Sequence, residues 1–81
     1  MPEREMPELL AWIARGLVDD PGAVRVESVE ADDALVLRLI VAPDDVGKVI
    51  GRQGRVARAL RTVVRSAGAR SDRRMVLEIE G

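Results

Sequence analysis

The chain has no cysteine and no histidine among its 81 residues. Without cysteine it forms no disulfide and no thiolate zinc site, and a reducing, cytoplasmic setting is expected. The two missing residue types are also common catalytic nucleophiles and general bases, and the three serines have no evident partner. The carboxylates fall at expected turns rather than converging on a pocket. We therefore expect no enzyme, no cofactor and no small-molecule substrate.

Phenylalanine and tyrosine are absent too, and Trp12 is the one aromatic residue. The chain therefore cannot bind a single-stranded nucleic acid in the way of proteins that stack the bases on aromatic side chains. A nucleic acid would have to be held by its phosphates and a shallow apolar groove, so its binding should be weak and sensitive to salt. Trp12 itself is expected in the core, with a subunit contact as the alternative.

No long hydrophobic run is present. The longest, residues 34–43, is interrupted by Arg38 and is far too short to span a bilayer, so no membrane partner is expected. The first residues lack the basic and then apolar order of a secretion signal. Residues 1–5 are expected to form a disordered leader, and residues 6–81 a single domain, since so short a chain has no room for two cores.

Charge is separated along the sequence, although the net charge is only −1. Residues 1–45 contain 11 acidic and 4 basic side chains, whereas residues 46–81 contain 3 acidic and 9 basic ones. Nearly all of the cations are arginines, whose guanidinium groups bind phosphate bidentately. Because the local field decides which partner is attracted, the second half of the chain is suited to a polyanion.

Hydrophobic periodicity predicts six elements in the order α-β-β-α-α-β. The predicted helices cover residues 6–18, 46–50 and 55–67, and the predicted strands cover residues 24–30, 34–41 and 75–80. A two-helix crossover separates the last two strands, which are therefore expected to be parallel. We predict an α+β fold with a three-stranded mixed sheet and the helices packed on one face. The strand over 34–41 should be central and buried on much of both faces.

Turn and cap residues punctuate these elements. The pairs Asp19-Asp20, Asp32-Asp33 and Asp44-Asp45 lie at predicted turns or helix ends, so capping explains them better than a divalent metal site does. Gly68 is expected to cap the long helix.

The loop Gly51-Arg52-Gln53-Gly54 lies between two predicted helices. Its glycines allow positive φ angles and close approach of another backbone, and the following helix adds the partial positive charge of its amino end. The long helix that follows has an arginine face, on which Arg55 is the best placed for binding. For Arg58, Arg61 and Arg65 a binding surface and a solvated helix face remain equally open, whereas Arg70, Arg73 and Arg74 are expected to be solvated.

The segment Gly47-Lys48-Val49-Ile50-Gly51-Arg52-Gln53-Gly54-Arg55, set between two helices inside a β-α-α-β unit, resembles the signature of a KH domain. The helix and strand ahead of it match the type II arrangement. The resemblance runs from about Leu9 to Ile79, including residues 17–21, 41–45 and 61–65, and throughout this range the chain is similar to the small bacterial single-KH proteins of the KhpA type. Arg52 and Arg58 stand where lysine is common in that family.

The resemblance implies single-stranded RNA binding, in which the loop clamps roughly four nucleotides by their backbone. It implies an RNA chaperone or post-transcriptional regulator, with a link to cell shape. It also implies self-association or pairing with a KhpB or Jag-type KH protein, and an assembly module with secondary RNA contact is the alternative function. DNA is not excluded. The RNA-binding residues implied are Gly51, Arg52, Gln53 and Gly54 at the phosphates, Lys48, Arg55 and Arg58 beside them, and Val46, Val49 and Ile50 along the groove.

Overall fold

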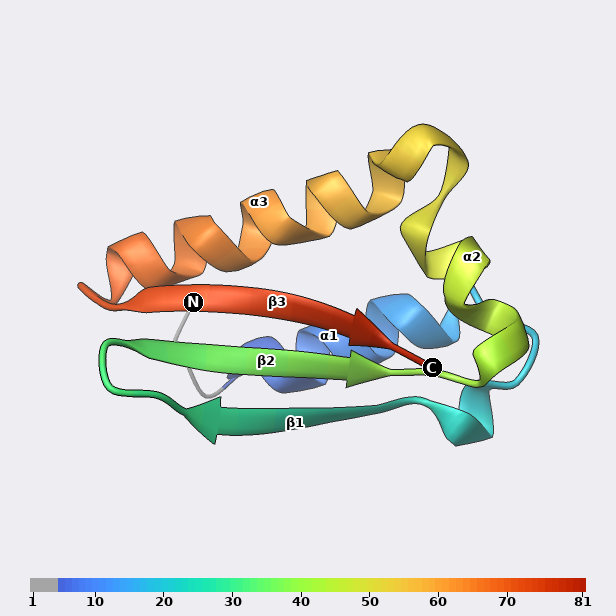
Figure 1. Cartoon of the computed structure of the whole chain (residues 1–81), viewed down its shortest axis with the longest axis horizontal. Helices are drawn as coiled ribbons and strands as arrows, with labels where there is room; N and C mark the ends of the chain where they lie inside the picture. Colours follow the sequence, from blue (N-terminus) through green and yellow to red (C-terminus); the bar gives the residue numbers. More distant parts are fainter. Residues whose placement is uncertain (1–4) are drawn as a thin grey trace.

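The six predicted elements occur in the predicted order in a computed structural model, which describes residues 5–81 (Figure 1). Residues 1–4 of the expected leader lie outside the described residues, and Glu5 directly precedes the first helix. Short 3₁₀ turns join several elements. The helices are α1 (Met6–Arg15), α2 (Val46–Ile50) and α3 (Arg55–Arg70), and the strands are β1 (Arg25–Glu30), β2 (Ala34–Ile40) and β3 (Arg74–Glu80).

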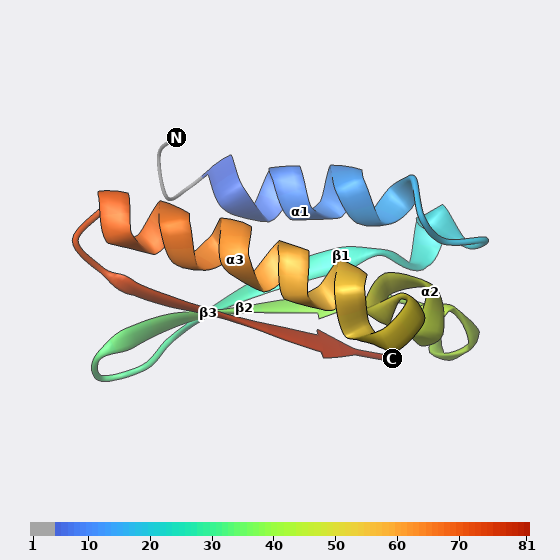
Figure 2. The ribbon, with the colours of Figure 1, turned by 90° about the horizontal axis from the view of Figure 1, so that it is seen from above.

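The sheet has the order β1-β2-β3, with β2 in the centre. β1 pairs antiparallel with β2 through a short hairpin, and β2 pairs parallel with β3 across the two-helix crossover. α1 and α3 lie side by side on one face of this sheet (Figure 2). The predicted α+β fold of the type II KH arrangement is confirmed.

The core lies between this pair of helices and the sheet. Leu37 and Leu39 of β2 are fully buried beneath the helices, where each side chain contributes about 2 kcal/mol. Val36, Arg38 and Ile40 of β2 point to the other face and are only half-buried. There Arg38 donates two hydrogen bonds to Glu80 and one to Glu27, tying the three strands together. β2 is central, as expected, and it is fully buried on the face that α1 and α3 cover, whereas burial on the other face is only partial.

Trp12 is 71% exposed, so the expectation that it belongs to the core is also wrong. α1 buries Leu10 and Ala14 against the sheet, and Trp12 lies about 200° around the helix from Leu10. The helix ends at Arg15, earlier than predicted, and Leu17 lies in the turn that follows. The indole therefore projects on the outer side of α1.

The predicted cap at Gly68 is wrong as well, because α3 continues through Gly68 to Arg70. Gly68 is buried, and a Cβ atom there would lie 3.0 Å from the Met75 side chain. The glycine lets β3 approach the helix. The helix end is formed by Asp72, with φ +53°, and by the Arg73 amide, which donates to the Gly68 carbonyl at 2.8 Å in a Schellman pattern.

Candidate nucleic-acid interface

The glycine loop, residues 51–54, turns the chain sharply between α2 and α3. Gly51 ends α2 with φ +79°, and its amide donates to the Gly47 carbonyl at 2.9 Å. The Gly54 amide in turn donates to the Gly51 carbonyl at 3.1 Å. Gln53 and Gly54 also have positive φ angles, +56° and +73°. The loop is thus a closed turn whose conformation requires the two glycines.

The two glycines are needed for different reasons. A Cβ atom on Gly51 would lie 2.5 Å from Cγ2 of Val56, so α3 packs directly against this position. A Cβ atom on Gly54 would meet nothing within 4 Å. Gly51 therefore joins the loop to the helix behind it, whereas Gly54 leaves bare backbone beside open space.

The amino end of α3 begins at this bare backbone. Its N-cap is Gly54, which has no side chain to accept a hydrogen bond from the first amides of the helix. No acidic residue lies in the first turn. The Arg55 amide donates to the Arg52 carbonyl, and the dipole of the helix gives this end a partial positive charge of about half a unit.

Three arginines surround the loop. The Arg55 Nη2 donates to Gln53 Oε1, and the Arg58 Nη2 donates to the Gln53 carbonyl, each at 3.3 Å. Arg52 is exposed and makes no hydrogen bond or ion pair with any described residue. None of the three pairs with a carboxylate in residues 5–81, so their charges are available to an anion. Arg58 has a second function, since it holds the carbonyl of a residue in the left-handed region.

Lys48 differs from these arginines. Its ammonium group lies 3.2 Å from Asp19 and 3.5 Å from Asp45. The hydrogen bond with Asp19, and to a lesser degree the contact with Asp45, raises the pKa of Lys48. Two carboxylates already compensate its charge, so its expected contact with phosphate stays a prediction.

Asp45 is a buried carboxylate, which the interpretation of this aspartate as a cap did not foresee. It is 2% exposed, and its Oδ2 accepts the Asp20 amide proton at 3.0 Å, while no side-chain cap is formed on α2. Desolvation acts to raise the pKa of Asp45, but hydrogen bonds from the amides of Asp20 and Asp19 and from Lys48 together lower it. The carboxylate therefore fixes the start of α2, and with it the loop, to the turn after α1.

The apolar residues expected along the groove are not equivalent. Val46 and Ile50 are half-buried on α2 and retain surface near the loop, and Gly47 between them is exposed. Val49 is fully buried in the core. The expectation that Val49 lines a surface groove is therefore corrected, because its side chain points inward and packs α2 against the core.

Other kinds of site find no support in the described part of the chain. Within residues 5–81, no three of the acidic side chains come together in a way that could hold a metal ion. No helix in the same range combines the length and the apolar character needed to cross a membrane.

Comparison with known proteins agrees with this geometry. The sequence profile of the KhpA/KhpB KH domain matches residues 7–79. The chain is 49% identical over 74 residues to the RNA-binding protein KhpA of Clostridium acetobutylicum, covering 91% of this chain and 99% of that protein. It is 51% identical over 72 residues to RNA-binding protein KhpA of Treponema pallidum, covering 89% and 90% of the two chains. The chain therefore belongs to the KhpA/KhpB family of KH-domain proteins.

Proposed function

We propose that this protein binds single-stranded RNA by holding the sugar-phosphate backbone on the glycine loop. The observation that carries the proposal is the set of three arginines without carboxylate partners around a bare turn at the amino end of a helix. Guanidinium forks and backbone amides are the groups that bind phosphate oxygens best. Relatives that match nearly the whole chain are named RNA-binding proteins.

In this proposal the bases play a minor part. Phosphate contacts orient a strand but carry no sequence information. Val46 and Ile50 offer a small apolar surface beside the loop, and the exposed Gly47 leaves room above α2. A protein with such a surface suits many RNAs, as an RNA chaperone or post-transcriptional regulator in the cytoplasm requires. Its task would be binding, without catalysis.

The double substitution R52D/Q53D tests the proposal. Both side chains are exposed, so the circular dichroism spectrum and thermal unfolding should stay close to those of the wild type. Two carboxylates would stand where phosphates are expected, and binding of a single-stranded RNA in fluorescence anisotropy should be lost. R15D/A31D makes the same change of charge at exposed positions on other elements and should keep most of the affinity. Undiminished RNA affinity of R52D/Q53D would show that the loop is only a turn.

The salt dependence of binding provides a second measurement. If the loop neutralises three phosphates, the slope of log K against log salt should be about −2 for a single strand. A flat response would contradict a phosphate-based interface.

We also propose that the protein assembles with a second KH chain, either a copy of itself or a KhpB or Jag-type partner. The observation that favours assembly is the exposed Trp12, which lines a hollow of about 630 Å³ on the outer side of α1 with Ile13, Arg15, Gly16 and Leu17. An exposed large aromatic residue of this kind is typical of the centre of a protein interface. RNA binding remains the first proposal, because more of the structure supports it.

A further inference from the structure

Lys48 differs from the other cations near the glycine loop in both type and pairing. It is the only lysine among the 13 lysines and arginines of the chain. It lies on α2, three residues before Gly51, and so within one helical turn of the loop. The arginines around the loop have no carboxylate partner in residues 5–81, whereas Lys48 has two. One cation beside the loop is therefore already occupied by the fold.

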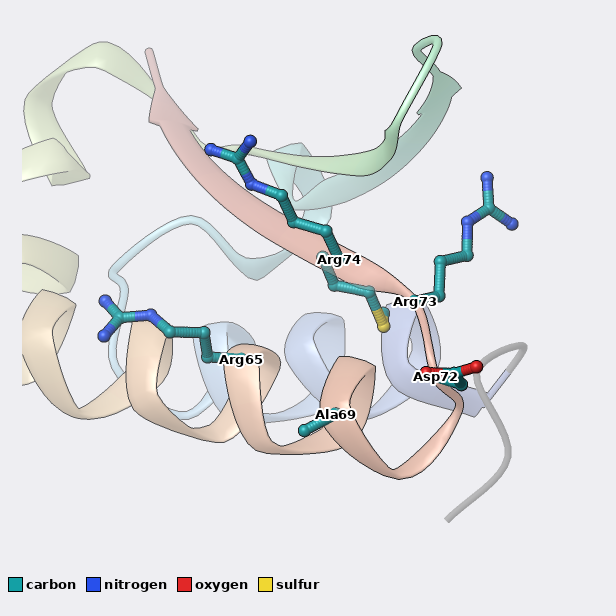
Figure 3. A pocket seen from close by; sticks show the side chains of 6 residues that line it. Arg65, Ala69, Asp72, Arg73 and Arg74 are labelled. Atoms are coloured by element: carbon teal, nitrogen blue, oxygen red, sulfur yellow. The ribbon is translucent and has the colours of Figure 1, made fainter.

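The other cations that form ion pairs within residues 5–81 lie away from the loop. Some belong to β1 and β2. Arg73 contacts Glu30 and Arg74 contacts Asp33, which ties the turn after α3 to the end of the β1-β2 hairpin. Figure 3 shows Arg73 and Arg74 where the chain leaves this turn and enters β3. The 16 residues of α3, about 24 Å, separate that turn from the glycine loop. These pairs therefore do not compete with an anion at the loop.

The two bonds of Lys48 hold its side chain away from the loop. The Nζ atom lies 3.2 Å from Oδ2 of Asp19 and 3.5 Å from Oδ1 of Asp45. Asp45 directly precedes α2, so the lysine side chain runs back toward the amino end of the helix, as helical side chains tend to do. An ammonium group has three donors and no fixed plane, which lets it serve carboxylates from two different elements.

The two carboxylates are not equivalent. The Asp45 side chain is 3% exposed and accepts the Asp20 amide proton, so it is part of the folded structure. The Asp19 side chain is 81% exposed in the turn after α1, and Lys48 is its one partner among residues 5–81. The hydrogen bond with Asp19 is nevertheless the largest contribution to the raised pKa of Lys48. Because exposed ion pairs add little to stability, the contact with Asp19 is not explained by folding alone.

A phosphate on the glycine loop would compete with Asp19 for the same ammonium group. Carboxylate and phosphate oxygens both accept charge-assisted hydrogen bonds from lysine. The pair with Asp19 is exposed and screened by water and salt, so a phosphate can replace it, but the exchange takes away part of the energy gained. Each exchange of this kind weakens the binding of a strand at the loop.

We propose that Asp19 is an internal competitor of RNA, whose carboxylate keeps Lys48 away from the phosphates at the glycine loop and so limits the affinity of the protein for RNA. The inference rests on the proposed RNA-binding function and adds a residue that regulates it. A limited affinity suits a protein that has to release the RNAs it binds.

The substitution D19N tests the inference. Asparagine has nearly the same size as aspartate but no charge, so it cannot hold the ammonium group as an ion pair. The affinity for a single-stranded RNA of roughly four nucleotides should rise about threefold at low salt, the effect of one exposed ion pair. The slope of log K against log salt should become steeper by about 0.7, because Lys48 adds one phosphate contact. Thermal unfolding should stay close to that of the wild type.

Two further variants separate this effect from a general change of charge. D44N removes an exposed carboxylate just before α2 that has no ion pair in residues 5–81, and it should raise the RNA affinity much less than D19N does. K48Q removes the cation for which Asp19 competes. In the K48Q background, D19N should therefore raise the affinity no more than D44N does in the wild type.

The single lysine allows a direct measurement. A protein labelled with ¹³C-lysine gives one Cε signal in NMR spectra, that of Lys48. In D19N this signal should shift when RNA is added, because the ammonium group then contacts a phosphate. In the wild type the same addition of RNA should move it far less.

Four outcomes would overturn the inference. They are an RNA affinity of D19N equal to that of the wild type, an equal gain in D44N, a Lys48 signal that RNA shifts as much in the wild type as in D19N, and loss of the fold in D19N. Failure of the proposed function looks different, because then R52D/Q53D would bind the RNA as tightly as the wild type does.

Discussion

Gly51 and Gly54 both have positive φ angles, but only Gly51 has a neighbour where a side chain would stand. A methyl group on Gly51 would collide with Val56 of α3, whereas one on Gly54 would project into open space. The motif that looks symmetric in sequence therefore has one structural glycine and one that keeps the surface bare.

G51A and G54A should separate these two functions. G51A combines left-handed strain with overpacking and should lower the free energy of unfolding by about 3 kcal/mol. G54A adds only the strain, about 1 kcal/mol. Urea denaturation followed by circular dichroism measures both, and RNA binding of folded G54A should still weaken because its methyl group would stand in the open space beside the loop backbone. Equal losses of stability in the two variants would contradict the packing described for Gly51.

At the scale of elements, the two ends of α3 are built differently. Its amino end is left without a side-chain cap and faces the loop, while its carboxyl end is closed by the hydrogen bond from the Arg73 amide to the Gly68 carbonyl. The closing turn places Asp72 in the left-handed region, where glycine is the usual residue. The helix is therefore open where an anion is proposed and closed where β3 begins.

D72G should raise the free energy of unfolding by about 0.5 kcal/mol. Glycine removes the cost of the left-handed conformation, and the greater freedom of the unfolded chain offsets part of that gain. A69G, in the last turn of the same helix, should instead lower stability by about 1 kcal/mol. The midpoints of chemical denaturation compare the two variants. Destabilisation by D72G would show that the Asp72 carboxylate stabilises the fold by more than its left-handed backbone conformation costs.

The start of α2 depends on a carboxylate brought from another part of the fold. Asp45 accepts the amide proton of Asp20 from the turn after α1 and also contacts Lys48. The pKa of Asp45 is lowered on folding, so its contribution to stability is present above the ordinary aspartate pKa, about 3.9, and is lost as pH falls through the folded value.

D45N should make this pH dependence visible. At neutral pH the variant should have a lower Tm than the wild type, because the amide cannot replace a charged acceptor for Asp20 and Lys48. The difference should begin to shrink as pH falls below about 4, where the aspartate of the unfolded chain takes up a proton, and should vanish below the lowered pKa of the folded state. Thermal unfolding across this range measures it. D44N, at the exposed neighbouring position, should follow the wild type throughout, and a pH-independent difference for D45N would contradict the account.

In the folded molecule, the charges no longer divide simply into an acidic half and a basic half as they do along the sequence. Several cations of the basic half meet carboxylates of the acidic half: Lys48 meets Asp19, and Arg73 meets Glu30. In the basic half, the arginines that have no carboxylate partner among residues 5–81 lie on the loop and on α3. The exposed Trp12 lies elsewhere, on the outer side of α1. RNA binding and assembly would thus use separate surfaces.

W12E tests this separation. A carboxylate in place of the exposed indole should disrupt an interface at α1, so the molar mass from light scattering should fall to that of a single chain. The fold should persist because the side chain is outside the core, and RNA affinity per chain should change little. E8A, at an exposed position on the same helix, is the control. A wild-type protein that is already a single chain at high concentration, or a W12E protein of unchanged mass, would contradict assembly through Trp12.

Local patterns in the sequence were enough to predict the order of the elements, the parallel pairing across the crossover and the glycine loop with Arg55 and Arg58 beside it. The elements and the loop depend on residues a few positions apart, where helix and strand periodicity and glycine conformation operate, and the parallel pairing follows from the length of the two-helix crossover between the strands. Tertiary structure alone decided the burial of Asp45, the pairing of Lys48, the exposure of Trp12 and the packing of Gly68. The physical reason is distance along the chain: Asp45 and its partner Asp20 are 25 residues apart, and only the packing of α1, α2 and the sheet brings such groups together.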